Sequence, residues 1–187
     1  MTDDPAVFGY GSLVNLATHD FAAPRAARLT GWRRIWRHST QRQVAFLSVE
    51  PDPNSSISGV IAHLPGGDWA ALDAREHAYT RRDVTHQVTH ISTPIATAVY
   101  EARPELTQHP SVGHPILLSY LDVVIQGFLQ LYGQDGVDDF IATTHDWGPI
   151  LNDRTAPIYP RAQTLSAQEI RIVDRTLEQL PVRMQHR

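Results

Sequence analysis

The chain has 187 residues, of which 42% are hydrophobic and 19% charged, as expected for a globular protein with a single domain over residues 1–187. It contains no cysteine, which excludes disulfides, thiolate zinc sites, iron–sulfur clusters and a thiol nucleophile. The formal net charge of -4 argues against nucleic acid as a partner.

Two stretches bear on secretion and membranes. Residues 1–11 begin with acidic side chains, whereas a secretory signal needs a basic start and a longer apolar run. The longest apolar region, residues 115–132, contains Asp122, Gln126 and Gln130 and is too polar to span a membrane. We therefore expect a cytoplasmic protein without a membrane partner.

The first half of the chain has the pattern of short strands separated by turns. The expected strands cover residues 6–8, 28–36, 44–50, 57–64, 83–91 and 95–101. Residues 51–56 and 65–67 are rich in proline, glycine, asparagine and serine and are expected to be turns. Residues 68–77 form the expected first helix, with Asp68 placed to cap it.

Helical patterns dominate after Pro110. Apolar residues in 116–131 repeat with a period of 3.6, which predicts an amphipathic helix, and a second helix is expected over 137–144. Ser166 and Glu169 have the spacing of a capping box that opens a last helix, continuing to Leu180. Residues 150–161 contain prolines and mixed charge and are expected to be extended. Strands followed by helices indicate an α+β fold.

A basic bias runs from Phe21 to Val49, where the sequence has no acidic residue. Six arginines fall there: Arg25, Arg28, Arg33, Arg34, Arg37 and Arg42. They could be solvated side chains on strand edges, or they could create a local positive field for a small anionic substrate.

The first candidate site is the turn Tyr10-Gly11-Ser12-Leu13, which follows the first expected strand. Two closely spaced glycines let the chain turn sharply and direct successive backbone N–H groups outward, and such a nest binds carboxylate or phosphate oxygens. A dinucleotide-binding loop would need a third glycine where Val14 stands. An ordinary tight turn is the alternative.

The second candidate is Glu76. Trp69, Leu72 and Glu76 are spaced i, i+3 and i+7 and share one face of the expected helix, so the Glu76 carboxylate points towards the protein body. A partly desolvated carboxylate suits proton transfer. Alternatively, Glu76 forms a structural ion pair with Arg75, Arg81 or Arg82. The neighbouring Asp73 has a shorter side chain that suits a cap or a local salt bridge.

Metal and triad chemistry are not expected. His86 and His90 are four residues apart in an expected strand, about 13 Å at roughly 3.3 Å per residue, too far to share one metal ion. The His-Glu-x-x-His motif is absent. Ser12 follows a strand, but the G-x-S-x-G elbow of serine hydrolases is missing.

Two of these segments resemble one known family. FGYGSL at residues 8–13, followed about sixty residues later by LDAREHAY at 72–79, is similar to the γ-glutamylcyclotransferases, and most closely to their ChaC-type branch. The segment from Gly31 to Thr40 resembles the Gly-Trp and arginine-rich strand and Ser-Thr turn of these proteins. Ser119 to Gly127 resembles the helix that follows, and residues 152–161 also look typical of the family.

The resemblance implies a small mixed β-barrel flanked by α-helices, with one pocket at its mouth. It also implies a reaction, in which the α-amine of a γ-glutamyl group attacks its own side-chain carbonyl and releases 5-oxoproline and a free amine. By analogy, Glu76 is the catalytic residue, and Tyr10, Gly11, Ser12 and Leu13 hold the glutamyl group. Neither a metal nor an organic cofactor is needed. The implied substrate is a small anionic γ-glutamyl compound: glutathione, a γ-glutamyl amino acid or a γ-glutamyl amine.

Two other classes of function compete with this enzyme. A non-catalytic module on the same fold would use the turn to bind a γ-glutamyl metabolite. A basic RNA-contacting domain would use the stretch from Arg25 to Arg42, and its binding would weaken steeply with salt.

Overall fold

A computed structural model describes residues 4–76, 79–89 and 94–186. Its main sheet is mixed and has the strand order β4-β6-β1-β3-β2-β5, with β8 paired to β2. The strands are β1 (Ala6–Gly9), β2 (Ala22–Arg37), β3 (Phe46–His63), β4 (Tyr79–Asp83), β5 (Val88–Thr89), β6 (Thr97–Ala102) and β8 (Thr144–His145). A separate parallel sheet contains β7 (Ile116–Leu117), β9 (Ile150–Asn152) and β10 (Met184–His186).

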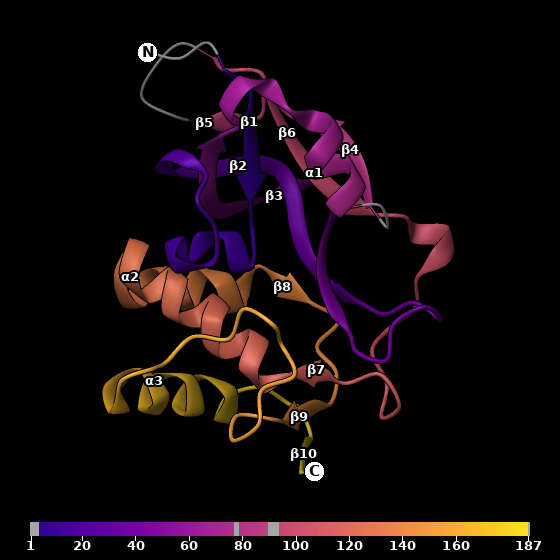
Figure 1. Ribbon diagram of the computed structural model, residues 1–187. Helices are drawn as coiled ribbons and strands as arrows, with labels where there is room; N and C mark the ends of the chain where they lie inside the picture. Colours follow the sequence, from indigo (N-terminus) through magenta and orange to yellow (C-terminus); the bar gives the residue numbers. More distant parts are fainter. Residues whose placement is uncertain (1–3, 77–78, 90–93, 187) are drawn as a thin grey trace.

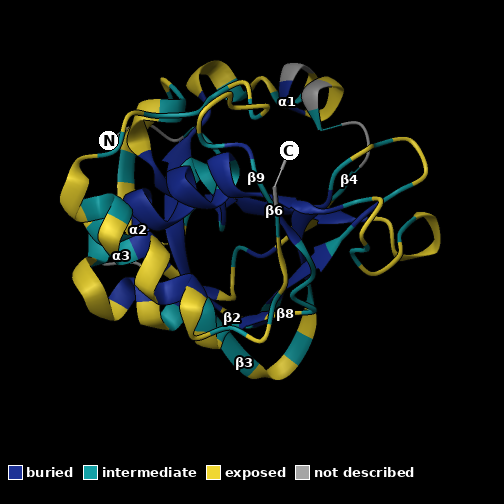
Figure 2. Ribbon diagram, turned by 90° about the horizontal axis from the view of Figure 1, so that it is seen from below, coloured by how far each residue is buried: buried dark blue, intermediate teal, exposed yellow. Residues whose placement is uncertain are grey.

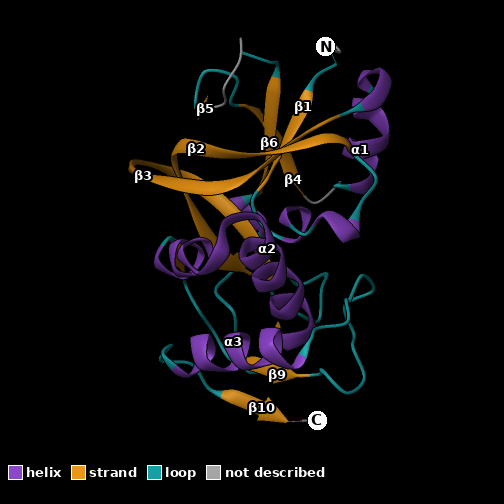
Figure 3. Ribbon diagram, turned by 90° about the vertical axis from the view of Figure 1, so that its left-hand side faces the viewer, coloured by secondary structure: helices purple, strands orange, loops and turns teal. Residues whose placement is uncertain are grey.

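The helices lie at the two ends of the molecule (Figure 1). Helix α1 (Trp69–Arg75) lies beside β4 and β6, whereas α2 (Leu118–Ala142) and α3 (Ala167–Glu178) lie at the other end with the small sheet. The main sheet curls into a half-barrel between them (Figure 3). The expected α+β fold, a small barrel-like mixed sheet flanked by helices, is confirmed.

One predicted turn is wrong. Residues 51–56 do not separate two strands, because β3 runs through them and pairs with β2 from His63 opposite Ala22 to Phe46 opposite Arg37. The register shifts within this ladder, and the extra residues of β3 bulge out. Asp52 closes the bulge by accepting hydrogen bonds from the Asn54 backbone N–H (3.1 Å) and the Ser55 hydroxyl (2.7 Å). Pairing then resumes, so the polar segment interrupts the ladder without ending the strand.

The strand predicted over residues 83–91 is also wrong. Asp83 ends β4, and its carboxylate accepts hydrogen bonds from the Thr85 N–H (2.9 Å) and hydroxyl (2.7 Å), which turns the chain. Only the short β5 follows within the described part of this region. His86 therefore lies in a turn, and His90, with which it was expected to share a strand face, lies outside the described residues.

The helical predictions fare better. Helix α2 is broken at Gly133, which has φ +71°, so the two expected helices are the two halves of one element. Residues 116 and 117, expected to be helical, instead form β7. Ser166 caps α3 in a complete capping box with Glu169, as predicted, although the helix ends at Glu178. Among the described residues, no helix combines the length and the apolar character needed to cross a bilayer.

The core has its largest cluster where α2 meets the sheet. Leu121, Ile125 and Phe128 on α2 are fully buried, and they belong to one cluster with Trp36 of β2 and Val60 of β3. Viewed from below, the buried segments gather in the centre, with the exposed ones on the outer faces (Figure 2). A smaller cluster joins Leu72 of α1 to residues of β1 and β6, and so fixes the short helix against the sheet.

Candidate active site

A cavity of about 380 Å³ opens between the end of β1, the end of α1 and the start of α2. This volume lies in the range of small-molecule sites. Its walls include all five residues predicted as site residues: Tyr10, Gly11, Ser12, Leu13 and Glu76. The turn and the acid, far apart in the sequence, thus meet at one cavity.

The turn begins where β1 ends. Its backbone tightens into a 3₁₀ turn over Ser12–Val14, closed by the Val14 N–H donating to the Gly11 carbonyl (3.0 Å). Gly11 is required by space, because a Cβ at this position would lie 2.6 Å from the hydroxyl oxygen of Tyr120. The first N–H groups of a helical turn have no partner within the turn, so they are available to a ligand or a neighbouring side chain.

Arg34 holds the turn from behind. This side chain of β2 is completely buried, and its Nε donates to the Tyr10 carbonyl (2.8 Å). It also donates to the Thr143 hydroxyl (2.6 Å) at the end of α2 and to the Ser58 carbonyl on β3. Burial lowers the pKa of Arg34 to about 9, so the guanidinium remains cationic at neutral pH. One buried cation therefore ties the turn to α2 and to the sheet.

Glu76 directly follows α1. Its backbone N–H donates to the Leu72 carbonyl (2.8 Å) and its carbonyl accepts from the Tyr79 N–H (2.8 Å), so its position is fixed from both sides. Two of the arginines weighed as structural partners are engaged by other acids. Arg81 pairs with Asp73 (2.9 Å) and Arg82 with Glu101 (2.8 Å).

Asp73, the competing carboxylate, is therefore a structural residue. Its salt bridge with Arg81 is the local pairing that its short side chain suggested. Its other oxygen accepts a hydrogen bond from the Tyr100 hydroxyl (2.6 Å). Both partners hold Asp73 against β4 and β6, and Asp73 is absent from the residues that line the cavity in the described structure.

Tyrosines form much of the cavity wall, and sequence reasoning singled out only one of them. Burial is the largest cause of a raised pKa for Tyr10, Tyr79 and Tyr120, and the Glu76 carboxylate adds to the rise for Tyr10 and Tyr79. These hydroxyls therefore stay protonated at neutral pH and can donate hydrogen bonds. Tyr10 donates to the carbonyl of Tyr100 (2.7 Å), which fixes its ring.

A further wall comes from the loop after β9, which sequence reasoning left without a role. Its lining residues are Ile158, Tyr159, Pro160 and Arg161. Asp153, 1% exposed, anchors this loop to α2: its carboxylate accepts from the Ser119 N–H (2.8 Å), the Ser119 hydroxyl (2.6 Å) and the Ile158 N–H (2.8 Å). Acidic and basic residues beside prolines in this loop were the available signal, but nothing local linked them to α2.

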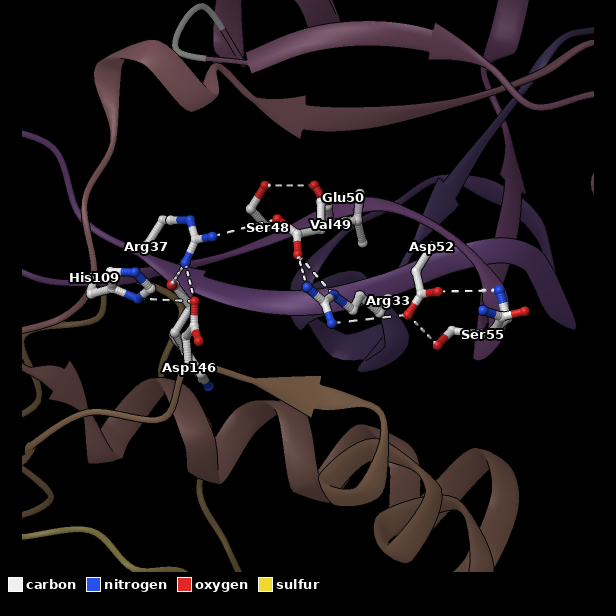
Figure 4. Close-up of polar contacts among 11 residues, drawn as sticks. Arg33, Arg37, Ser48, Val49, Glu50, Asp52, Ser55, His109 and Asp146 are labelled. Atoms are coloured by element: carbon white, nitrogen blue, oxygen red, sulfur yellow. Dashed lines mark hydrogen bonds and ion pairs between the residues drawn. The ribbon is translucent and has the colours of Figure 1, made fainter.

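Three arginines of the arginine-rich stretch form ion pairs in the described structure: Arg28, which pairs with Asp139, and Arg33 and Arg37 (Figure 4). Arg33 pairs with Glu50, and Arg37 pairs with both Glu50 and Asp146. These acids lie outside the stretch in the sequence, and their charges offset part of the positive charge of the arginines, whereas Arg25 and Arg28 are exposed on β2 as the solvated alternative expects. Of the six arginines, Arg42 is the one that lines the cavity in the described structure.

No group of three or more histidine, aspartate or glutamate side chains with a geometry suited to a metal ion occurs in residues 4–76, 79–89 and 94–186.

Comparisons with known proteins give a family and a fold. A family model described as "Gamma-glutamyl cyclotransferase, AIG2-like" matches residues 7–118, and no curated protein matches. A solved structure named "Gamma-glutamyl cyclotransferase" is 15% identical, with a TM-score of 0.59 over 92% of this chain and 99% of that chain. An uncharacterized protein from Homo sapiens is also 15% identical, with a TM-score of 0.60 and the same coverage. YkqA from Bacillus subtilis is 16% identical, with a TM-score of 0.58 over 75% of this chain and 54% of that one. At these identities the likeness bears on the fold alone.

Proposed function

Because this chain belongs to the AIG2-like gamma-glutamyl cyclotransferase family, we propose that it cyclises a γ-glutamyl compound and releases 5-oxoproline and a free amine. The observation that carries the proposal is the meeting of the turn Tyr10-Gly11-Ser12-Leu13 and Glu76 at one cavity of about 380 Å³. The turn supplies backbone donors for an anionic substrate, and the acid supplies a base for its amine.

The chemistry needs a folded substrate and one proton carrier. The α-amine attacks the γ-carbonyl carbon within the same molecule, so the cavity must hold the glutamyl chain curled, with the amine near the carbonyl. Glu76 accepts a proton from the ammonium group, which frees the nitrogen lone pair. The new C–N bond forms, and Glu76 returns that proton to the departing nitrogen as the γ-amide C–N bond breaks. The attacking nitrogen, now part of the lactam, loses one more proton, which the released amine takes up to leave as an ammonium. Such acid–base help contributes about 10²–10⁴-fold to the rate.

Developing negative charge on the carbonyl oxygen needs donors that are already in place. The N–H groups of the turn and the hydroxyl of Tyr120 are the candidates for that role, because Tyr10 and Tyr79 donate their hydroxyl protons to the carbonyls of Tyr100 and Leu47. Arg34 acts as a positioning residue, because its hydrogen bond to the Tyr10 carbonyl fixes the direction in which the turn presents its N–H groups.

The finer assignments rest on the motifs. FGYGSL at 8–13 and LDAREHAY at 72–79 favour the ChaC-type branch, and a cytoplasmic enzyme acting as a single domain fits the composition. Glutathione, a γ-glutamyl amino acid and a γ-glutamyl amine are the three substrate classes. All share the γ-glutamyl group and differ in the amine that leaves.

A substrate panel tests the proposal. The protein is incubated with one member of each class, and 5-oxoproline is measured by chromatography. Release of 5-oxoproline from at least one compound is expected. Binding of these compounds without any 5-oxoproline would instead identify a non-catalytic γ-glutamyl binding module.

A further inference from the structure

The cavity carries a net positive charge within an acidic protein. Its charged lining residues in the described structure are Arg42, Glu76 and Arg161, whereas the whole chain has a net charge of -4. No carboxylate of the described residues lies within ion-pair distance of Arg161. A guanidinium without an acidic partner at a small cavity is suited to binding a carboxylate ligand, since its N–H groups match the two oxygens.

Hydrogen bonds to α2 fix the position of the loop that carries Arg161. The loop that carries it is anchored at one end by the buried Asp153 carboxylate, which accepts three hydrogen bonds from Ser119 and Ile158. Beside this anchor, Arg154 makes two hydrogen bonds of 2.8 Å to Asp122 on α2. Both connections join the loop to the start of α2, where Tyr120 lines the cavity. The loop is therefore a fixed wall of the site.

Arg161 belongs to the side of the cavity that contains the turn. Its Nε donates to the Tyr159 hydroxyl (3.2 Å), and the Tyr159 ring packs edge-on against Tyr120 with centroids 5.0 Å apart. The Tyr120 hydroxyl lies next to Gly11. Burial raises the pKa of Tyr120, and the charge of Arg161 acts in the opposite direction, which agrees with this proximity.

Arg42 belongs to a different part of the wall. Its guanidinium stacks on the Phe46 ring, 4.9 Å from the centroid, and lies 6.0 Å from the centroid of Tyr79. Tyr79 follows Glu76 closely in the chain, and the Glu76 carboxylate adds to the rise that burial causes in the pKa of Tyr79. The two arginines therefore flank the site from separate elements, with Arg161 beside the turn and Arg42 beside Glu76.

We infer that Arg161 binds the α-carboxylate of the γ-glutamyl group and so determines specificity for it. This inference rests on the proposed function, in which the turn holds the glutamyl group. The α-carboxylate then lies between backbone N–H groups of the turn and the Arg161 guanidinium. Since residue 161 lies beyond the segment matched by the family model, this specificity residue comes from a part of the chain outside that match.

The test uses two ligands that differ in one group. Binding of 5-oxoproline and of its carboxamide, 5-oxoprolinamide, is measured by calorimetry for wild type, Arg161→Gln and the control Arg171→Gln. Arg171 is an exposed arginine on α3, so its variant makes the same charge change away from the cavity. We expect Arg161→Gln to weaken binding of 5-oxoproline by about 10- to 100-fold and to leave binding of the carboxamide unchanged. The control should bind both ligands like wild type.

Kinetics give an independent readout. With a γ-glutamyl substrate, Arg161→Gln should raise KM by a similar factor while kcat changes little, and Arg161→Lys should recover part of the loss. Equal effects of Arg161→Gln on both ligands, or wild type that does not prefer 5-oxoproline, would overturn the inference. An Arg161-dependent preference for 5-oxoproline in a protein that turns over no substrate would support the inference and refute the proposed function.

Discussion

The close approach of Gly11 to Tyr120 allows a sharp test of the site's geometry. In Gly11→Ala, the new Cβ would lie 2.6 Å from the Tyr120 hydroxyl oxygen and 3.8 Å from the ring carbon that carries it. The Tyr120 ring cannot move away easily, because Trp36 and Tyr159 pack edge-on against it with centroids 5.8 and 5.0 Å away. Removing the hydroxyl in Tyr120→Phe should therefore relieve the closest contact, while the Leu47 Cδ2 methyl stays 3.2 Å from the new Cβ in both backgrounds.

The expected changes in unfolding free energy follow from these contacts. Overpacking of this kind costs about 1–3 kcal/mol of unfolding free energy, so Gly11→Ala alone should lose that amount. Tyr120→Phe alone removes the polar contact of the hydroxyl with the Ser12 backbone, which contributes at most about 0.5–1.5 kcal/mol. In the double variant the nearest ring carbon is at an ordinary contact distance. Introducing Gly11→Ala into the Tyr120→Phe variant should therefore cost at least about 1 kcal/mol less than introducing it into wild type.

The assay is urea unfolding of the four proteins of this double-mutant cycle. A coupling energy of about 1 kcal/mol or more, with the double variant more stable than the sum predicts, supports the geometry. If Gly11→Ala costs the same in both backgrounds, within about 0.5 kcal/mol, the two groups do not meet as described.

Other predictions concern the loop anchor and the capping box. Asp153→Ala should lower the unfolding free energy by about 3 kcal/mol, because it leaves donors of Ser119 unpaired. The same variant should raise KM as Arg161→Gln does. Unchanged stability would show that Asp153 does not anchor the loop. Ser166→Ala should cost about 1 kcal/mol in urea unfolding, and a negligible change would refute the cap. The last of these predictions concerns the pKa of Glu169. Burial acts to raise this pKa, but hydrogen bonds from Ser166 and neighbouring glutamines together hold it below its usual value of 4.5. The ionised Glu169 carboxylate therefore stabilises the fold fully above pH 4.5, and this stabilisation is lost as the pH falls through the lower pKa of the folded protein. Glu169→Gln should make the unfolding free energy fall less steeply at acidic pH. An unchanged fall at acidic pH would contradict the pairing.

Sequence reasoning succeeded where a feature is set by neighbours in the chain. The capping box of Ser166 and Glu169 needs residues three apart, and it formed as predicted. The break at Gly133 separates two helical patterns that were both visible in the sequence. The turn after β1 and the acid after α1 were likewise found from short motifs, with a family resemblance to connect them.

The predictions from sequence were wrong where pairing between segments far apart in the chain overrides a local pattern. Residues 51–56 have the composition of a turn, and Asp52 does bend the chain there, yet β2 restores the ladder on both sides. The arginine-rich stretch appeared unpaired because its partners Glu50 and Asp146 lie outside it. Such partners become visible only when the strands are assembled.

The same limit applies to the cavity. Tyr159 and Arg161 line it because Asp153 fastens their loop to Ser119, 34 residues earlier in the chain. No periodicity or motif in residues 150–161 points to α2. Loops that carry binding residues are placed by a few buried polar contacts, and such contacts have a weak signature in one sequence.

Turnover by Glu76→Gln compared with wild type addresses the central claim most directly. Glutamine keeps the size of the side chain and cannot carry the proton, so kcat for 5-oxoproline release should fall by about 10²–10⁴-fold while substrate binding and the unfolding free energy stay close to wild type. A Glu76→Gln enzyme that releases 5-oxoproline at the wild-type rate would show that this carboxylate is not the base.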